Sequence, residues 1–214
     1  MVIDGVVLAG GLSSRMGEDK ALLKRDERDM LTYTADLVSS LSIERLLISR
    51  NEATTIGYQP NDADGDAYNC AHKSAYNCAH KFEVFNDVVA GVGPLGGIYS
   101  VAIQSKADAL IITPVDLPLL RTEDLEQLIN EGSSAKRPAY FSHHYLPLFL
   151  PLTKEVRQYL DDVVKGKVPQ RSVNTMCTNF GAVEVTPKNN SRLTNVNTPA
   201  QWDAAKKLLS LAGN

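Results

Sequence analysis

Near its start the chain reads VIDGVVLAGGLSSRMGEDKAL, residues 2–22. The aliphatic run 2–9 stops at two consecutive glycines, a pattern typical of a buried strand that ends in a turn. Glycines let backbone amides come close to a ligand, and the loop after them offers hydroxyl and cationic donors. These donors are Ser13, Ser14, Arg15 and Lys20. The stretch predicts a central strand followed by a phosphate-binding loop. The alternative is a glycine turn whose charged side chains are only solvated.

This loop differs from two well-known phosphate-binding motifs. A dinucleotide-binding fingerprint has glycine at its first, third and sixth positions, whereas the glycines here are Gly10, Gly11 and Gly17. A P-loop has lysine directly after its last glycine and then serine or threonine, but Lys20 lies three residues after Gly17 and precedes Ala21. A phosphate-binding role would therefore require a loop of another design.

Strand-like and helix-like segments alternate along the rest of the chain. Strands are expected at 45–49, 81–85, 109–113, 138–141, 146–150 and 181–185, and helices at 31–41, 98–102, 122–129, 154–164 and 198–209. This alternation implies an α/β fold with a mostly parallel sheet. In such sheets ligands bind beyond the carboxyl ends of the strands.

Two of the expected helices carry clear start signals. Thr122 is expected to be an N-cap, because acidic residues follow it in the first turn and complement the helix dipole. Thr198 is expected to cap the last helix, with Pro199 at its first position. The apolar stripe expected to be buried on that helix consists of Trp202, Ala205, Leu208 and Leu209.

The composition indicates an ordinary globular chain. Its 214 residues are 43% hydrophobic and 22% charged, which allows a sizeable core without metals or disulfides. The formal net charge of −3 argues against nucleic acid as a partner. The apolar runs are too short for a membrane span, and the start lacks the basic and apolar stretches of a secretory signal, so a cytoplasmic location is expected. Three cysteines do not suggest a disulfide framework.

Asp116 is the best candidate for a metal ligand. It follows the strongly apolar run 109–113 and lies between two prolines that stiffen its backbone. Mg²⁺ takes one or two protein carboxylates and completes its shell with water and substrate phosphates, so one fixed aspartate would be enough. The alternative is an aspartate that begins a helix in a turn. Asp87, after the expected strand 81–85, is a similar but less well framed candidate.

Two further turns are candidates for ligand contacts. GPLGG at 93–97 leads into a helix, where glycine allows close approach to the amino terminus. NVNTP at 195–199 is a rigid turn whose asparagines could read a polar ligand or only cap the backbone.

A direct repeat interrupts the regular pattern. AYNCAHK at 67–73 recurs at 75–81, and a variable surface loop at 59–81 is the simplest interpretation. A zinc site at Cys70, His72, Cys78 and His80 is disfavoured, because all four ligands come from one duplicated segment with atypical spacing. Cys177 has no activating neighbours and is expected to be a buried small side chain.

Taken together, the motifs resemble the molybdenum cofactor guanylyltransferase family, within the wider group of nucleotidyltransferases with a GT-A-like Rossmann core. The resemblance rests on LAGG at 8–11, RMG at 15–17, DKAL at 19–22, GPLGG at 93–97, PVDLP at 114–118, LPLF at 146–149 and NVNTP at 195–199. It implies a three-layer Rossmann-like fold in a single domain, 1–214. About 1–105 would form the nucleotide-binding half and about 106–214 the metal- and acceptor-binding half.

The resemblance also implies roles for particular residues. The catalytic residues would be Arg15, Lys20 and Asp116, with Asp116 as the magnesium ligand. The nucleotide-binding residues would be Leu8, Ala9, Gly10, Gly11, Lys20, Asn51, Asp87 and Asp116. The contact at the end of the second strand stays open between Ser49 and Asn51. Gly96 and Asn197 would bind the acceptor, and Pro147 and Arg171 would also face the pterin.

The activity implied by the resemblance is transfer of GMP from GTP to the terminal phosphate of molybdopterin, with Mg²⁺ as cofactor and pyrophosphate as the second product. Transient contacts with other cofactor-synthesis or acceptor proteins are expected. One alternative is a related nucleotidyltransferase that uses CTP or a sugar-phosphate acceptor. Another is a non-catalytic nucleotide-binding protein, against which the intact Lys20 and Asp116 argue.

Overall fold

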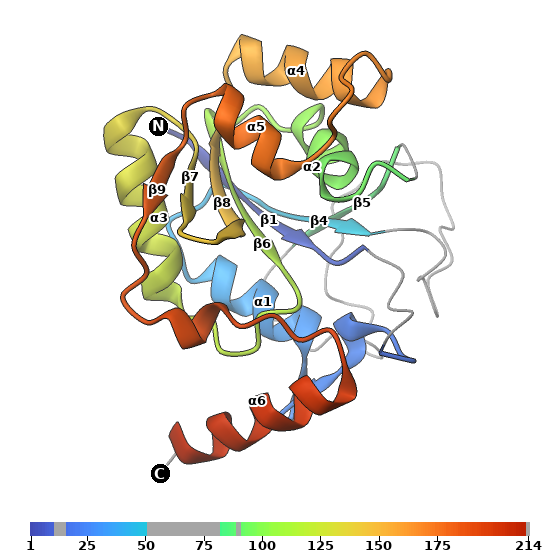
Figure 1. The fold of residues 1–214 in the computed structure, drawn as a ribbon, viewed down its shortest axis with the longest axis vertical. Coiled ribbons are helices and arrows are strands. Elements are labelled where there is room, and N and C mark those ends of the chain that lie inside the picture. Colours follow the sequence, from blue (N-terminus) through green and yellow to red (C-terminus); the bar gives the residue numbers. More distant parts are fainter. Residues whose placement is uncertain (11–15, 51–81, 89–90, 213–214) are drawn as a thin grey trace.

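The computed structural model describes residues 1–10, 16–50, 82–88 and 91–212. A seven-stranded sheet of order β5-β4-β1-β6-β8-β7-β9 forms the centre (Figure 1). Its strands are β1 Ile3–Leu8, β4 Leu46–Arg50, β5 Glu83–Asn86, β6 Ala109–Pro114, β7 Ala139–Phe141, β8 His144–Pro151 and β9 Val183–Val185. β8 runs antiparallel to both of its neighbours, and the other pairs are parallel. The expected α/β fold with a mostly parallel sheet is confirmed.

Helices cover both faces of the sheet and make three layers (Figure 1). The helices are α1 Met30–Ser39, α2 Pro94–Ala102, α3 Thr122–Ala135, α4 Lys154–Val164, α5 Val173–Asn179 and α6 Pro199–Ala212. α1 and α3 pack on one face, whereas α2, α4 and α5 pack on the other. A short hairpin of β2 Lys24–Arg25 and β3 Arg28–Asp29 lies outside the main sheet. Among the described residues, no helix is long and apolar enough to cross a membrane.

The central strands are mostly apolar because both of their faces are buried. In β1, Ile3 and Val7 belong to the core under α1 and α3, whereas Val6 and Leu8 belong to the core under α2 and α4. Successive side chains of a strand point to opposite faces, so a strand between two helical layers needs apolar residues at nearly every position. This explains why the run 2–9 could be recognised as a central strand from the sequence.

The C-terminal helix packs on the segment that follows the glycine-rich loop. Trp202 and Ala205 of α6 form a third apolar cluster with Met16, Leu23 and Met30. The first turns of α6 therefore hold the segment around Lys20 from outside the sheet. Leu208 is 48% exposed, so its expected place in a buried stripe is wrong. The apolar cluster under α6 includes side chains from the first turns of this helix and does not include Leu208.

Three local predictions need correction. Arg121, not Thr122, is the N-cap of α3, and its backbone amide donates to Asp124 Oδ2 at 3.0 Å. The strand expected from 181 begins at Val183, because Gly181 has a left-handed φ of 56° that no extended strand adopts. α5 was not expected, since a helix of 7 residues is too short to show a periodic apolar pattern.

Candidate active site

A cavity of about 550 Å³ lies at the carboxyl ends of the central strands β1, β4 and β6. Its lining residues are Leu8, Ala9, Gly10, Asp19, Lys20, Ser49, Asp87, Gly91, Gly93, Pro94, Gly97, Pro114, Val115, Asp116, Leu146 and Asn195. This is the edge at which parallel α/β sheets bind their ligands. The cavity brings together residues from both halves of the chain.

Backbone of the glycine-rich segment forms one wall of the cavity. Leu8 ends β1, and the Ala9 amide donates to the Ser49 carbonyl at 2.8 Å, which holds this segment against β4. Gly10 is exposed at the cavity. Gly11, Arg15 and Asn51, which were also candidates, lie outside the described residues.

Ser49 and Asp87 form a hydrogen-bonded pair at the ends of neighbouring strands. The Ser49 hydroxyl donates to Asp87 Oδ1 at 2.5 Å. A Cβ on Gly97 of α2 would lie 3.2 Å from Asp87 Oδ1 and 3.3 Å from Leu8 Cδ2, and nearer still to the Ser49 hydroxyl. Glycine at 97 therefore keeps this corner of the cavity open. Gly96, the candidate at the preceding position, is buried in the same helix and is not among the lining residues.

Lys20 and Asp116 both line the cavity and form an ion pair there. Lys20 Nζ lies 2.6 Å from Asn197 Oδ1 and 3.4 Å from Asp116 Oδ2. Asn195 Nδ2 donates to the other carboxylate oxygen, Asp116 Oδ1, at 3.1 Å. The Val196 amide donates to the Asp116 carbonyl at 2.9 Å, so the turn before α6 is bound to the loop after β6. Residues up to 177 positions apart in the chain thus form one polar cluster.

The segment that carries Lys20 is a short 3-10 helix, η1 Lys20–Leu22. Asp19 is its N-cap, and Asp19 Oδ1 accepts from the Ala21 amide at 3.0 Å. The second carboxylate oxygen of Asp19 accepts from the guanidinium of Arg50 at the end of β4. Sequence reasoning missed both Asp19 and Arg50, although an aspartate directly before a helix-forming stretch is a recognisable N-cap signal.

The residues around Asp116 suit magnesium better than a softer metal. The described residues contain no group of three or more His, Cys, Asp or Glu placed to bind a metal together. The polar partners of Asp116 are Lys20 Nζ and Asn195 Nδ2, so the metal-ligating atoms at this point are the two hard oxygens of the Asp116 carboxylate. Mg²⁺ prefers oxygen ligands and needs only one or two protein carboxylates when substrate phosphates complete its shell. Asp116 therefore fits a magnesium ion that binds together with a phosphate substrate.

Leu146 of β8 also lines the cavity, and the Leu146–Pro147 peptide bond is cis. Pro147 is buried, and Arg171 is exposed and is not a lining residue. Cys177 is buried as expected, and burial raises the pKa of its thiol to about 12. Burial therefore disfavours the thiolate, the reactive form of a cysteine, which agrees with a structural role for Cys177.

Comparison with known proteins shows to which class of protein the chain belongs. The model of the MobA-like NTP transferase domain matches residues 5–175, the region that contains the cavity except for the turn at 195–197. The chain is therefore a nucleotidyltransferase, a transferase enzyme. It is also 33% identical over 202 residues to a molybdenum cofactor guanylyltransferase from Xanthomonas euvesicatoria pv. vesicatoria, with 92% of this chain and 91% of that protein covered. The chain belongs to the molybdenum cofactor guanylyltransferase family.

Solved structures agree with this fold. Molybdopterin-guanine dinucleotide biosynthesis protein A from Archaeoglobus fulgidus superimposes with a TM-score of 0.70, at 19% identity and with 97% of this chain and 98% of that chain covered. 4-diphosphocytidyl-2C-methyl-D-erythritolsynthase from Anaerococcus prevotii superimposes with a TM-score of 0.68 at 10% identity, with 98% and 96% covered. At these identities the likeness shows that the fold is shared.

Proposed function

We propose that this chain transfers GMP from GTP to the terminal phosphate of molybdopterin, forming the guanine dinucleotide and pyrophosphate. The observation that carries the proposal is the cluster of Lys20, Asp116 and Asn197 in a cavity beside the glycine-rich segment. A cation and a metal-binding carboxylate at one point suit a substrate with several phosphates. Membership of the family supports guanylyl transfer to the molybdenum cofactor.

The two substrates would use different parts of the cavity. Backbone of 8–10 would hold the guanine nucleotide, together with Gly11, Asp87 and either Ser49 or Asn51. The phosphates would lie at Lys20, with Arg15 supplying a second cation from the glycine-rich loop. Asn197, which accepts from Lys20, would contact the acceptor, and the buried Gly96 would act only through α2, whose Pro94 and Gly97 line the cavity. When bound at Asp116, Mg²⁺ would neutralise negative charge on the phosphates of the donor.

The reaction needs positioning and charge neutralisation more than acid–base chemistry. A phosphate oxygen of molybdopterin attacks the α-phosphorus of GTP, a new P–O bond forms, and the bond to the β-phosphate breaks to release pyrophosphate. The second pKa of a phosphate monoester is about 6, so the attacking oxygen is largely ionised at neutral pH and needs no general base. Lys20 would stabilise the charge that develops on the phosphates and hold the reacting groups in line.

Thermal unfolding with different nucleotides tests the choice of donor. A ligand at 100 times its Kd stabilises the native state by about 2.7 kcal/mol, which raises Tm by roughly 5–10 °C for a chain of this size. We expect this rise with GTP and Mg²⁺, a smaller rise with GTP alone, and little with CTP, ATP or UTP. A rise with CTP instead of GTP would contradict the guanylyl assignment and favour cytidylyl transfer.

A further inference from the structure

Arg50 and Asp19 form an ion pair at the wall of the cavity, and neither residue has a role in the proposed reaction so far. The Arg50 guanidinium contacts Asp19 Oδ2, and the two side chains are only 7% and 14% exposed. Removing both charges from water costs much of what their attraction supplies, so such a pair is weak evidence for a purely stabilising role. Its place beside the nucleotide site suggests a different purpose.

The ion pair connects the two ends of the nucleotide site. Asp19 caps the short helix η1, whose first residue is Lys20, by accepting from the Ala21 amide at 3.0 Å. On the other side, the Arg50 carbonyl accepts from the Asp87 amide at 3.4 Å. Arg50 therefore contacts the segment of Asp87 through its backbone and the turn of Lys20 through its side chain. A substitution of the Arg50 side chain keeps the backbone contact to Asp87 and removes the contact to the turn of Lys20.

The negative charge of Asp19 must be neutralised when a nucleoside triphosphate binds. Asp19 lines the cavity, and a nucleoside triphosphate brings several negative charges into that cavity. A carboxylate facing these phosphates without a cation beside it would repel them, because Coulomb interactions are strong at sites with little water. Arg50 places a permanently charged guanidinium against this carboxylate.

We propose that Arg50 is a positioning residue for the donor nucleotide: it neutralises Asp19 and, through Asp19, holds the turn that directs Lys20 to the phosphates. This inference rests on the proposed function only in that the cavity binds a nucleoside triphosphate. It does not depend on which base is bound or which acceptor is used.

The decisive comparison is between Arg50→Met and Arg45→Met. Arg45 directly precedes β4 and pairs at 2.9 Å with Asp4, which is fully buried, at the end of the strand away from the cavity. Each variant removes an arginine that pairs with a buried or mostly buried carboxylate. The two arginines lie at opposite ends of β4, and only Arg50 lies at the end near the cavity. We expect Arg50→Met to raise the nucleotide Kd, measured by calorimetry without acceptor, and to lower kcat, each by about 10-fold to 100-fold. Arg45→Met should lower Tm and leave Kd and kcat unchanged.

Asp19→Asn separates neutralisation from packing. The asparagine oxygen can still accept from the Ala21 amide, so the cap is kept while the charge is lost. Added to Arg50→Met, it should recover much of the lost nucleotide affinity. The double variant leaves no unpaired carboxylate in the wall of the cavity, so it can be compared with wild type even if Arg50→Met alone does not fold, and its nucleotide Kd should lie close to the wild-type value.

Two results would overturn the proposal. One is an Arg50→Met variant with wild-type Kd and kcat, or with losses matched by Arg45→Met. The other is a double variant that binds nucleotide no better than Arg50→Met, or far more weakly than wild type. If the wild-type chain binds CTP and not GTP, guanylyl transfer fails as the function, and the same comparison is made with CTP.

Discussion

An Asp116→Ala variant is expected to lose nucleotidyl transfer almost completely. Asp116 lies in the cavity 3.4 Å from Lys20 Nζ and is the residue proposed to hold magnesium. A metal ion on a phosphoryl oxygen contributes several kcal/mol of transition-state stabilisation, so its loss should lower kcat/KM by at least about a thousandfold. Initial rates of pyrophosphate release at saturating Mg²⁺ measure the effect.

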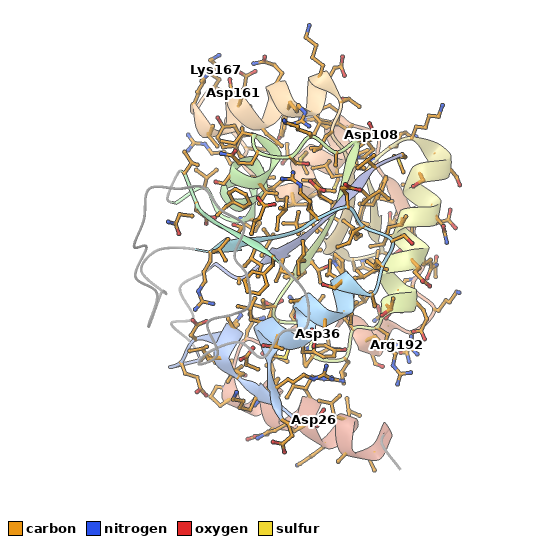
Figure 2. The ribbon with its side chains drawn as sticks, turned by 180° about the vertical axis from the view of Figure 1, so that it is seen from behind. Asp26, Asp36, Asp108, Asp161, Lys167 and Arg192 are labelled. Atoms are coloured by element: carbon orange, nitrogen blue, oxygen red, sulfur yellow. The ribbon has the colours of Figure 1, made fainter. Side chains whose placement is uncertain are left out.

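Asp116→Asn separates charge from shape. Asparagine has nearly the same size and can still accept from Asn195, but it lacks the negative charge, so a similar loss of activity is expected. Asp161→Asn is the matched control, because Asp161 lies on the outer helix α4, at the opposite end of the molecule from α6 (Figure 2). It should keep wild-type activity. Substantial turnover by Asp116→Ala at ordinary magnesium concentrations would refute the metal-binding role.

A Lys20→Ala variant is expected to bind the donor nucleotide more weakly and to react more slowly. Among the described residues that line the cavity, Lys20 is the cation that pairs with Asp116. Its side chain is only 18% exposed. Removing one positioned donor to a developing negative charge lowers kcat by about 10²-fold to 10³-fold. Steady-state kinetics over a range of nucleotide concentrations give kcat and KM separately.

Lys24→Ala is the control for this variant. Lys24 lies four residues further along the same segment, but its side chain is 68% exposed and it pairs with Asp29 outside the cavity. It should leave both constants unchanged. Wild-type kinetics for Lys20→Ala, or equal losses in both variants, would show that Lys20 does not act on the phosphates.

The sequence was sufficient to predict the central fold because the decisive strands are buried on both faces. β1 and β6 read as mostly apolar runs, with Asp4 in β1 and Thr113 in β6 as the polar exceptions, and each ends at a motif that lines the cavity. Residues whose motifs follow these strands, such as Lys20 and Asp116, could therefore be assigned to the same edge of the sheet. The antiparallel pairing of β8 between β6 and β7 could not be read in this way, since an apolar strand pattern carries no direction.

Contacts between distant segments were beyond sequence reasoning. The Lys20–Asn197 hydrogen bond joins residues 177 positions apart, and no local pattern predicts that the turn before α6 contacts the segment of Lys20. The Arg50–Asp19 pair was missed for the same reason, because an arginine at the end of a strand has no characteristic spacing from its partner. The buried stripe of α6 was extended too far, to Leu208, because helical periodicity does not tell where the packing partner ends.

Transfer of labelled nucleotide tests the proposed function most directly. The chain is incubated with molybdopterin, Mg²⁺ and GTP labelled in turn at the α- and γ-phosphate. We expect the α-label to appear in a pterin dinucleotide and the γ-label in pyrophosphate, with no such transfer by Asp116→Asn. If the α-label stays in GTP while the chain binds that nucleotide, or if labelled CTP is transferred in preference, guanylyl transfer to molybdopterin is not the function of this chain.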